Sequence, residues 1–119
     1  MEIDIILSHC LKKEYVEECL PFDENTLVFK VKGKMFLLVA LDSWPLQINV
    51  KCNPERAIEL REQFPDILPG YHMNKKHWNT IICSQALSDK QILSWIDDSY
   101  SLVAKSLPQK TQAEFKFLK

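Results

Sequence analysis

Glycine is scarce in this chain, which has only Gly33 and Gly70 among its 119 residues. The phosphate-binding loop of nucleotide hydrolases and the fingerprint of dinucleotide-binding domains both need several glycines within a short segment. The two glycines stand far apart in the sequence, so both kinds of nucleotide site are excluded.

Paired cysteines and long apolar runs are also missing. No Cys-x-x-Cys pair occurs among the four cysteines, which are Cys10, Cys19, Cys52 and Cys83. We therefore expect four reduced thiols and no disulfide framework. The apolar run at residues 3–7 is too short for a signal peptide, and no later run has the length of a membrane span. A cytoplasmic protein without membrane association is expected.

Neither sign of charge dominates. Lys and Arg number 15 and Asp and Glu number 16, which gives a net charge of -1. No overall field then attracts the protein to nucleic acid or to acidic lipid, so any basic interaction depends on a local patch. The length predicts one domain that spans residues 1–119.

In the first half of the chain, hydrophobic periodicity predicts one helix and three strands. Apolar residues recur at helical spacing over residues 2–12, and an acidic, irregular connection is expected over 14–24. Strands are predicted at residues 26–31, 34–41 and 46–51. In the first of these, Leu27, Phe29 and Val31 alternate with outward-facing Thr26, Val28 and Lys30. Lys32-Gly33 fits a tight hairpin, because glycine readily adopts the positive φ that such a turn needs.

The second half begins and ends with helices. Asn53 is a strong N-cap and Pro54 suits the first helical position, so a helix is predicted to begin there and to end before Pro65. A strand follows at residues 78–83. Ser88 and Gln91 form a capping box for a last helix that continues to Pro108, and residues 109–119 permit a late edge strand. The predicted class is α+β, with helices packed on an antiparallel sheet.

Chemically distinctive residues concentrate at positions 69–81, Pro-Gly-Tyr-His-Met-Asn-Lys-Lys-His-Trp-Asn-Thr-Ile. We expect Gly70 to adopt positive φ in a turn and Trp78 to be buried in a strand. The remaining polar, basic and aromatic side chains are expected to be accessible and to contact nucleic acid: Tyr71, His72, Asn74, Lys75, Lys76, His77 and Asn79.

A second basic cluster, Lys30, Lys32 and Lys34, lies on the predicted 26–41 hairpin. If both hairpin tips point the same way, the lysines can neutralise phosphates while asparagine reaches base edges. The alternative is that lysines near strands and turns only prevent association between sheet edges.

Metal binding and catalysis have weaker support in the sequence. His72 and His77 are poorly spaced for shared ligation, and a zinc site would need Cys52 or Cys83 without a recognised spacing. No metal or cofactor is predicted. Cys83 could act as a nucleophile beside a histidine, as could Ser84, but sequence spacing cannot establish such a pair. A non-enzymatic protein is expected.

The 69–80 segment resembles the signature of the MmcQ/YjbR family. The resemblance extends over most of the chain and includes Phe22-Asp23-Glu24, Val28-Phe29-Lys30-Val31, Gly33-Lys34-Met35-Phe36, Lys51-Cys52-Asn53-Pro54 and Ser99-Tyr100. It implies a CyaY-like, secretion-chaperone-like α+β fold and a DNA-binding role. This chain departs from the family before Pro21, where relatives tend to have a Leu-Pro-Gly element.

DNA is therefore the expected partner, bound by the two basic hairpin tips and the 69–81 segment. The alternative is a protein-interaction module, in which the edge of the sheet pairs with an extended peptide.

Overall fold

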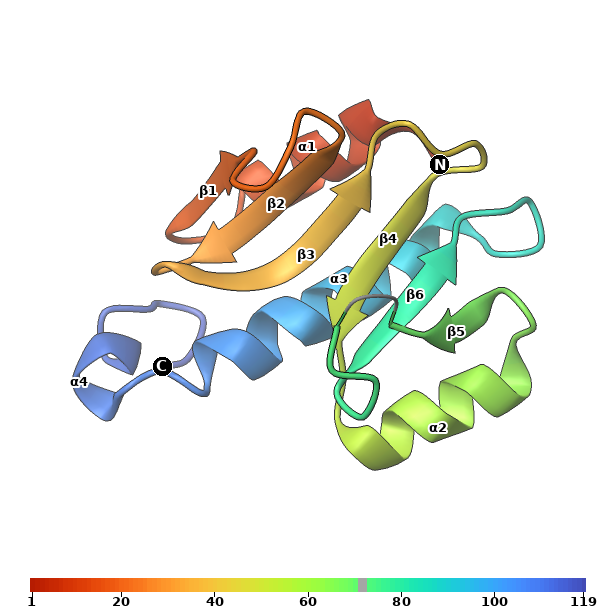
Figure 1. Ribbon diagram of the computed structural model, residues 1–119. Coiled ribbons are helices and arrows are strands. Elements are labelled where there is room, and N and C mark those ends of the chain that lie inside the picture. The colour runs from red at the N-terminus through yellow and green to blue at the C-terminus, as the bar shows by residue number, and fades with distance from the viewer. Residues whose placement is uncertain (71–72) are drawn as a thin grey trace.

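The computed structural model describes residues 1–70 and 73–119 and confirms the α+β class. The elements, in chain order, are α1 (Ile3–Leu11), β1 (Val16–Cys19), β2 (Thr26–Val31), β3 (Lys34–Ala40), β4 (Gln47–Lys51), α2 (Pro54–Gln63), β5 (Ile67–Pro69), β6 (Trp78–Ile82), α3 (Asp89–Ala104) and α4 (Gln109–Gln112). The six strands form one antiparallel sheet in the order β1-β2-β3-β4-β6-β5 (Figure 1).

The two faces of this sheet have different surroundings. Helices α1 and α3 lie behind the sheet in Figure 1, so the face toward the viewer is left uncovered. Strand alternation assigns each residue to a face. The covered face carries the row of cross-strand neighbours Leu27, Val39, Ile48, Ile81 and Ile67, and the open face carries the row Cys19, Val28, Leu38, Asn49, Thr80 and Leu68.

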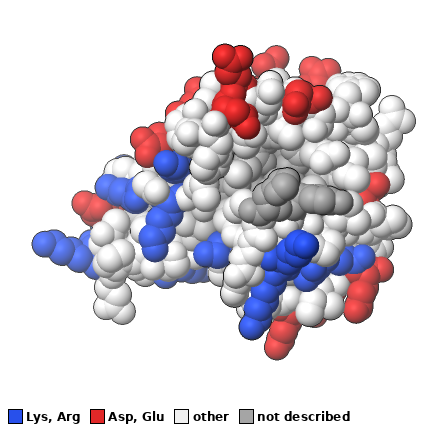
Figure 2. All heavy atoms as spheres, in the orientation of Figure 1, with Lys and Arg blue, Asp and Glu red and all other residues white. Residues whose placement is uncertain are grey.

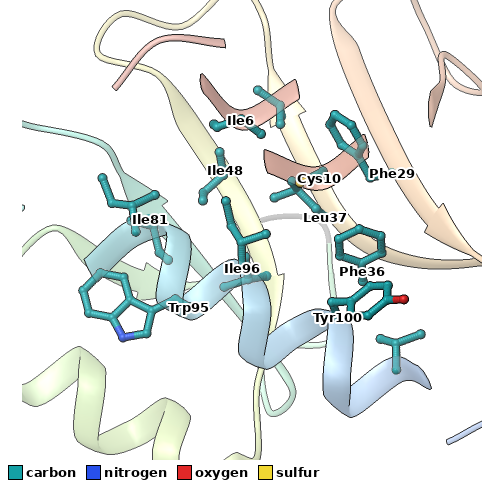
Figure 3. Packing of buried hydrophobic residues seen from close by; sticks show 14 of the residues in the cluster. Ile6, Cys10, Phe29, Phe36, Leu37, Ile48, Ile81, Trp95, Ile96 and Tyr100 are labelled. Atoms are coloured by element: carbon teal, nitrogen blue, oxygen red, sulfur yellow. The ribbon is translucent and has the colours of Figure 1, made fainter. Parts of the chain in front are cut away.

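The main core lies between the covered face and the helices, and α3 contributes most to it. Trp95, Ile96 and Val103 are 8%, 0% and 2% exposed, which confirms the buried side expected for this helix. Figure 3 shows Trp95 and Ile96 directed toward the sheet, with Ile48 nearby and Ile6 of α1 above. Helix α3 thus covers β3 and β4 on this face.

A β-bulge in β3 strengthens this contact. Phe29 pairs with Leu37 and Lys30 pairs with Met35, so Phe36 is the extra residue. Its ring contacts that of Tyr100 at 5.3 Å between centroids. Buried Ser99 donates to the Phe36 carbonyl at 2.6 Å and accepts from the Lys51 backbone N–H at 2.8 Å. One hydroxyl therefore joins α3 to the bulge and to the end of β4.

The predicted helix caps and the first hairpin are confirmed. Asn53 Oδ1 accepts from the Glu55 backbone N–H at 3.0 Å, and Ser88 and Gln91 form the reciprocal capping box. At the hairpin tip, Lys32 and Gly33 have φ of 50° and 83°. Positive φ at both central residues matches the right-handed twist of the flanking strands.

Three local expectations were wrong. Residues 14–24 are not wholly irregular, because Val16–Cys19 forms β1 and pairs with β2. Val28 does face away from the helices but is 0% exposed, since it packs with Leu38 and Trp78 on the open face. The C-terminal segment is no edge strand: it forms α4 and then a turn whose Phe115 is fully buried.

The carboxylate of Glu14 holds this C-terminal segment in place. It accepts the backbone N–H of Lys116 at 2.9 Å and that of Phe117 at 3.0 Å. The hydrogen bond from Lys116 is the main reason that the pKa of Glu14 is lowered. Across residues 1–70 and 73–119, no helix has the length and apolar character needed to span a membrane.

Candidate nucleic-acid interface

The sheet brings both lysine-bearing hairpins to the same end. The start of β3 lies beside the end of β4, which in turn lies beside the start of β6, as the pairs Leu37–Val50 and Lys51–Trp78 show. The β2–β3 turn and the β5–β6 loop therefore project in the same direction, as required for the two basic tips to act together (Figure 1).

Five lysines define what we call the basic end of the sheet: Lys30, Lys34, Lys51, Lys75 and Lys76. Lys34 lies at the hairpin tip and pairs with Val31, whose side chain is on the covered face. Lys34, Lys75 and Lys76 are exposed, and Lys30 and Lys51 are half-buried. Strand alternation directs Lys30 and Lys51 to the open face, because they stand two residues from Val28 and Asn49. The basic end thus combines three solvent-exposed cations with two that rest on the sheet.

Acidic residues gather at the opposite end of the same face. Asp23 and Glu24 lie in the β1–β2 loop and Asp42 in the β3–β4 loop, and the backbone hydrogen bond from Leu41 to Asn25 joins these loops at 2.7 Å. Figure 2 shows most of the Lys and Arg side chains over the lower half of the face and a group of Asp and Glu along its upper rim, with further acidic side chains at the lower and left margins. A protein with a net charge of -1 therefore presents one clearly basic surface.

Lys32 differs from the other lysines of the hairpin. Its Nζ lies 3.1 Å from Glu114 Oε2 and 3.9 Å from the centroid of the Tyr15 ring. An ion pair and a cation–π contact direct this side chain toward the C-terminal segment. Lys32 was predicted to contact nucleic acid, but in the structure it ties the hairpin to the rest of the fold.

Asn74 organises the part of the β5–β6 loop at residues 74–78. Its Oδ1 accepts from the Lys76 backbone N–H at 2.9 Å, and its carbonyl accepts from His77 and Trp78 at 3.1 and 2.9 Å. The Asn74 side chain stays exposed, as predicted, while its hydrogen bonds hold Lys75 and Lys76 at the tip of a tight turn.

Gly70 closes the other side of this loop, although it does not adopt the expected positive φ. Its N–H donates to the Trp78 carbonyl at 2.8 Å. A Cβ on residue 70 would lie 2.8 Å from Trp78 Cβ and 3.0 Å from Trp78 O. Close approach to β6, and not backbone conformation, is the reason for glycine here. Trp78 is 8% exposed, as expected.

We expect Gly70→Ala to lower the free energy of unfolding by about 1–3 kcal/mol, the usual effect of overpacking a tight site. Urea denaturation followed by circular dichroism measures this change. Gln85→Ala, at an exposed position, serves as control and should change stability by less than about 0.5 kcal/mol. Equal stability of the two variants would contradict the close-approach account.

Asn79 was predicted to contact nucleic acid, and this is wrong. It is 1% exposed on the covered face, where its Nδ2 donates to the Ala57 carbonyl of α2 at 3.3 Å. Its Oδ1 has no hydrogen-bond partner among the residues that the structure describes. Because Asn79 stands between Trp78 and Thr80, strand alternation places it on the side opposite to theirs.

His77 is half-buried at the base of the loop. Its carbonyl accepts from the Cys52 N–H at 2.7 Å, and it lines a hollow of about 280 Å³ together with Lys51. Tyr71 and His72 lie outside the described residues, so their predicted roles stay predictions.

The two buried thiols, Cys10 and Cys83, are poorly suited to nucleophilic chemistry. Burial raises the pKa of Cys10 to about 12 and that of Cys83 to about 11. At neutral pH both are protonated, and a thiol is far less nucleophilic than a thiolate. The other proposed nucleophile, Ser84, donates its hydroxyl hydrogen to Asp66 at 2.6 Å. Within the described part of the chain, no three His, Cys, Asp or Glu side chains could hold a metal ion together.

Sequence patterns did not reveal a groove on the open face, which extends to the acidic end at Asp23. It measures about 440 Å³ and is lined by Phe22, Asp23, Thr26, Leu38, Ala40, Gln47, Asn49, Met73 and Thr80. These residues come from four strands and two loops, so only the register of the sheet brings them together. The sequence did predict that Gln47 and Asn49 of the strand at residues 46–51 face outward, and both residues line this groove.

A sequence profile described as YjbR matches residues 11–102, which is most of the chain. The chain belongs to the YjbR family. An uncharacterised Escherichia coli protein, YbdF, is 38% identical over 103 residues, which cover 86% of this chain and 84% of YbdF. Escherichia coli YjbR, also uncharacterised, is 32% identical over 110 residues and covers 92% of this chain and 93% of its own length.

Solved structures of related proteins share the fold. The crystal structure of Deinococcus radiodurans protein DR2400, described with the family-model domain DUF419, superposes with a TM-score of 0.90 at 36% identity and covers 94% of this chain and 86% of DR2400. A crystal structure from Pseudomonas syringae gives a TM-score of 0.72 at 28% identity and covers 86% of this chain and 98% of that one. The YjbR family resemblance is thereby confirmed in sequence and in fold.

Proposed function

We propose that this YjbR-family protein is a cytoplasmic, non-enzymatic DNA-binding protein whose basic end contacts the phosphate backbone. The observation that carries the proposal is the placement of Lys30, Lys34, Lys51, Lys75 and Lys76 at one end of the sheet, with the acidic loops at the other end. Such an arrangement orients a polyanion even when the net charge is close to zero.

The position of the lysines in the sheet argues against a purely protective role. Strands β2, β3 and β4 are interior in the order β1-β2-β3-β4-β6-β5, so Lys30, Lys34 and Lys51 do not guard an edge. Edge strands are the ones that lysine protects from association. Interior strands are already paired on both sides, so their lysines are not required to prevent association. Phosphate binding is consistent with the position of these three cations.

The edges themselves give the protein-interaction alternative little support. One edge is β1, four residues long with exposed Glu17 and Glu18, and the other is β5, three residues long and ending at Pro69. Short edges with charged residues or proline are typical of strands that avoid pairing with other chains. An extended peptide would find few backbone groups to pair with.

Replacing Lys75 tests the proposal. Lys75→Ala should weaken binding of every duplex sequence alike, by roughly 15-fold at 50 mM salt, because each phosphate contact contributes about -0.9 to the slope of log affinity against log salt. Fluorescence anisotropy of labelled 20-base-pair duplexes measures the affinity.

Lys90→Ala is the matched control, since Lys90 is equally exposed but lies on α3, which covers the other face. Its affinity for DNA should equal that of the unmodified protein. If Lys75→Ala and Lys90→Ala bind alike, the basic end is not the binding surface.

A further inference from the structure

The floor of the open-face groove is a row of three neighbours across the sheet, Leu38 of β3, Asn49 of β4 and Thr80 of β6. Phe22 and Met73 reach it from the β1–β2 and β5–β6 loops. Its volume of about 440 Å³ is within the range of small-ligand sites. Figure 2 shows a recess in this face just below the acidic rim.

Polar groups in this groove are held in fixed positions. Thr80 Oγ1 donates to Asn49 Oδ1 at 2.6 Å, which orients the Asn49 amide. The two N–H donors of that amide make no hydrogen bond to the residues that the structure describes, 1–70 and 73–119. At the acidic end, Asp23 Oδ1 accepts from the backbone N–H groups of Asn25 and Thr26, both at 2.8 Å. The groove thus offers amide donors in its floor and a carboxylate at its rim, the groups that read base edges.

Phe22 adds an aromatic surface to this site. The side chain lines the groove and is 64% exposed, although a phenylalanine gains by burial. Exposed aromatic rings are the usual platform on which unpaired bases stack, and Phe22 provides one at the acidic end of the groove, next to Asp23.

Lys30 and Lys51 are placed to bind the phosphate of a nucleotide whose base lies in the groove. Lys30 and Lys51 stand two residues along β2 and β4 from Val28 and Asn49, on the same face. Two residues of strand span about 6.6–6.8 Å, a length comparable to the separation of a nucleobase from its own phosphate. The groove is acidic at Asp23 and basic toward Lys51, and a nucleotide has the complementary polarity, with amino groups on most bases and a negative phosphate.

We propose that this groove holds one unpaired nucleotide of a single strand, with its base against Phe22 and Leu38, its edge at Asn49 and Asp23, and its phosphate at Lys30 and Lys51. The inference rests on the proposed DNA binding and specifies its substrate. A paired base cannot present its edge and face to the groove without leaving the stack. The protein therefore prefers single strands, or duplexes with an unpaired base, over intact duplex.

The test compares a labelled 20-nucleotide single strand with a duplex of the same sequence at 100 mM salt, using anisotropy. The single strand should bind about tenfold more tightly. Phe22→Ala should lower single-strand affinity about tenfold, as is usual when one stacking ring is removed, and leave duplex affinity unchanged. Asn49→Asp should weaken single-strand binding more than duplex binding, because it keeps the acceptor for Thr80 but removes both N–H donors from the floor of the groove.

Phe22→Ala is expected to fold normally because the ring is exposed, and thermal melting verifies this for both variants. Ile58→Ala, on α2 and 51% exposed, is the matched apolar control and should bind both DNAs as the unmodified protein does. In addition, the Asn49 side-chain amide resonances should shift on addition of a six-nucleotide strand and not on addition of intact duplex.

Each remaining outcome contradicts a definite part of this account. Normal duplex binding with no preference for single strands, and with Phe22→Ala unchanged, overturns the groove inference and leaves the proposed function intact. Absence of binding to both DNAs overturns the proposed function as well. Tighter binding of free deoxynucleoside 5′-monophosphate than of the six-nucleotide strand, with the same Asn49 shifts, assigns the groove to free nucleotides and overturns the single-strand inference.

Discussion

Trp95→Ala should lower the free energy of unfolding by about 3–5 kcal/mol, as truncation of a core aromatic residue does. The indole is 8% exposed, and its ring lies 5.3 Å from that of Phe64 in an edge-to-face arrangement. Removing it leaves a cavity between α3, the sheet and the end of α2. Chemical denaturation with urea measures the loss directly.

Trp44→Ala is the matched control, because it makes the same tryptophan-to-alanine replacement at an exposed position. Trp44 is 89% exposed in the β3–β4 loop, so its replacement should change stability by less than about 0.5 kcal/mol. Comparable losses for the two tryptophans would contradict the packing of α3 on the sheet.

Reversing one charge on each hairpin should produce the largest loss of function. The double variant Lys34→Glu with Lys75→Glu removes a cation from both tips, and if each contacts a phosphate the affinity for duplex DNA at 50 mM salt should fall by at least about 200-fold. Both side chains are exposed, so the fold should be preserved. Anisotropy titrations measure the affinity, and circular dichroism verifies the fold.

The matched control is Lys12→Glu with Lys90→Glu. Both lysines are exposed, and they lie at the end of α1 and on α3, the helices that cover the other face. The two double variants have the same net charge, so a general charge effect would weaken them equally. Equal weakening would show that the hairpin tips bind no DNA of their own.

The sequence predicted those parts of the fold that depend on neighbouring residues. Asn53 with Pro54 and Ser88 with Gln91 act within one helical turn, so their cap geometry follows from residue type alone. The Lys32-Gly33 hairpin is equally local. Strand β1 was missed because Val16–Cys19 has acidic residues at its centre, and its pairing with β2 depends on a partner distant in sequence.

The candidate site was less predictable, for the same reason. Lys32 bears the same charge as Lys34, yet its partner Glu114 is near the other end of the chain. Asn79 lies within a polar motif, but only the register of β6 determines that it faces α2. The groove arises from Leu38, Asn49 and Thr80, which become neighbours only through pairing of β3, β4 and β6.

The central claim is that the basic end neutralises DNA phosphates, and the salt dependence of duplex binding by the unmodified protein tests it most directly. Titrations of a labelled 20-base-pair duplex between 50 and 300 mM NaCl should give a log-log slope of about -3 to -4.5, because up to five lysines each contribute about -0.9. No change in anisotropy at 50 mM salt with about 100 µM protein, or an affinity independent of salt, would contradict it.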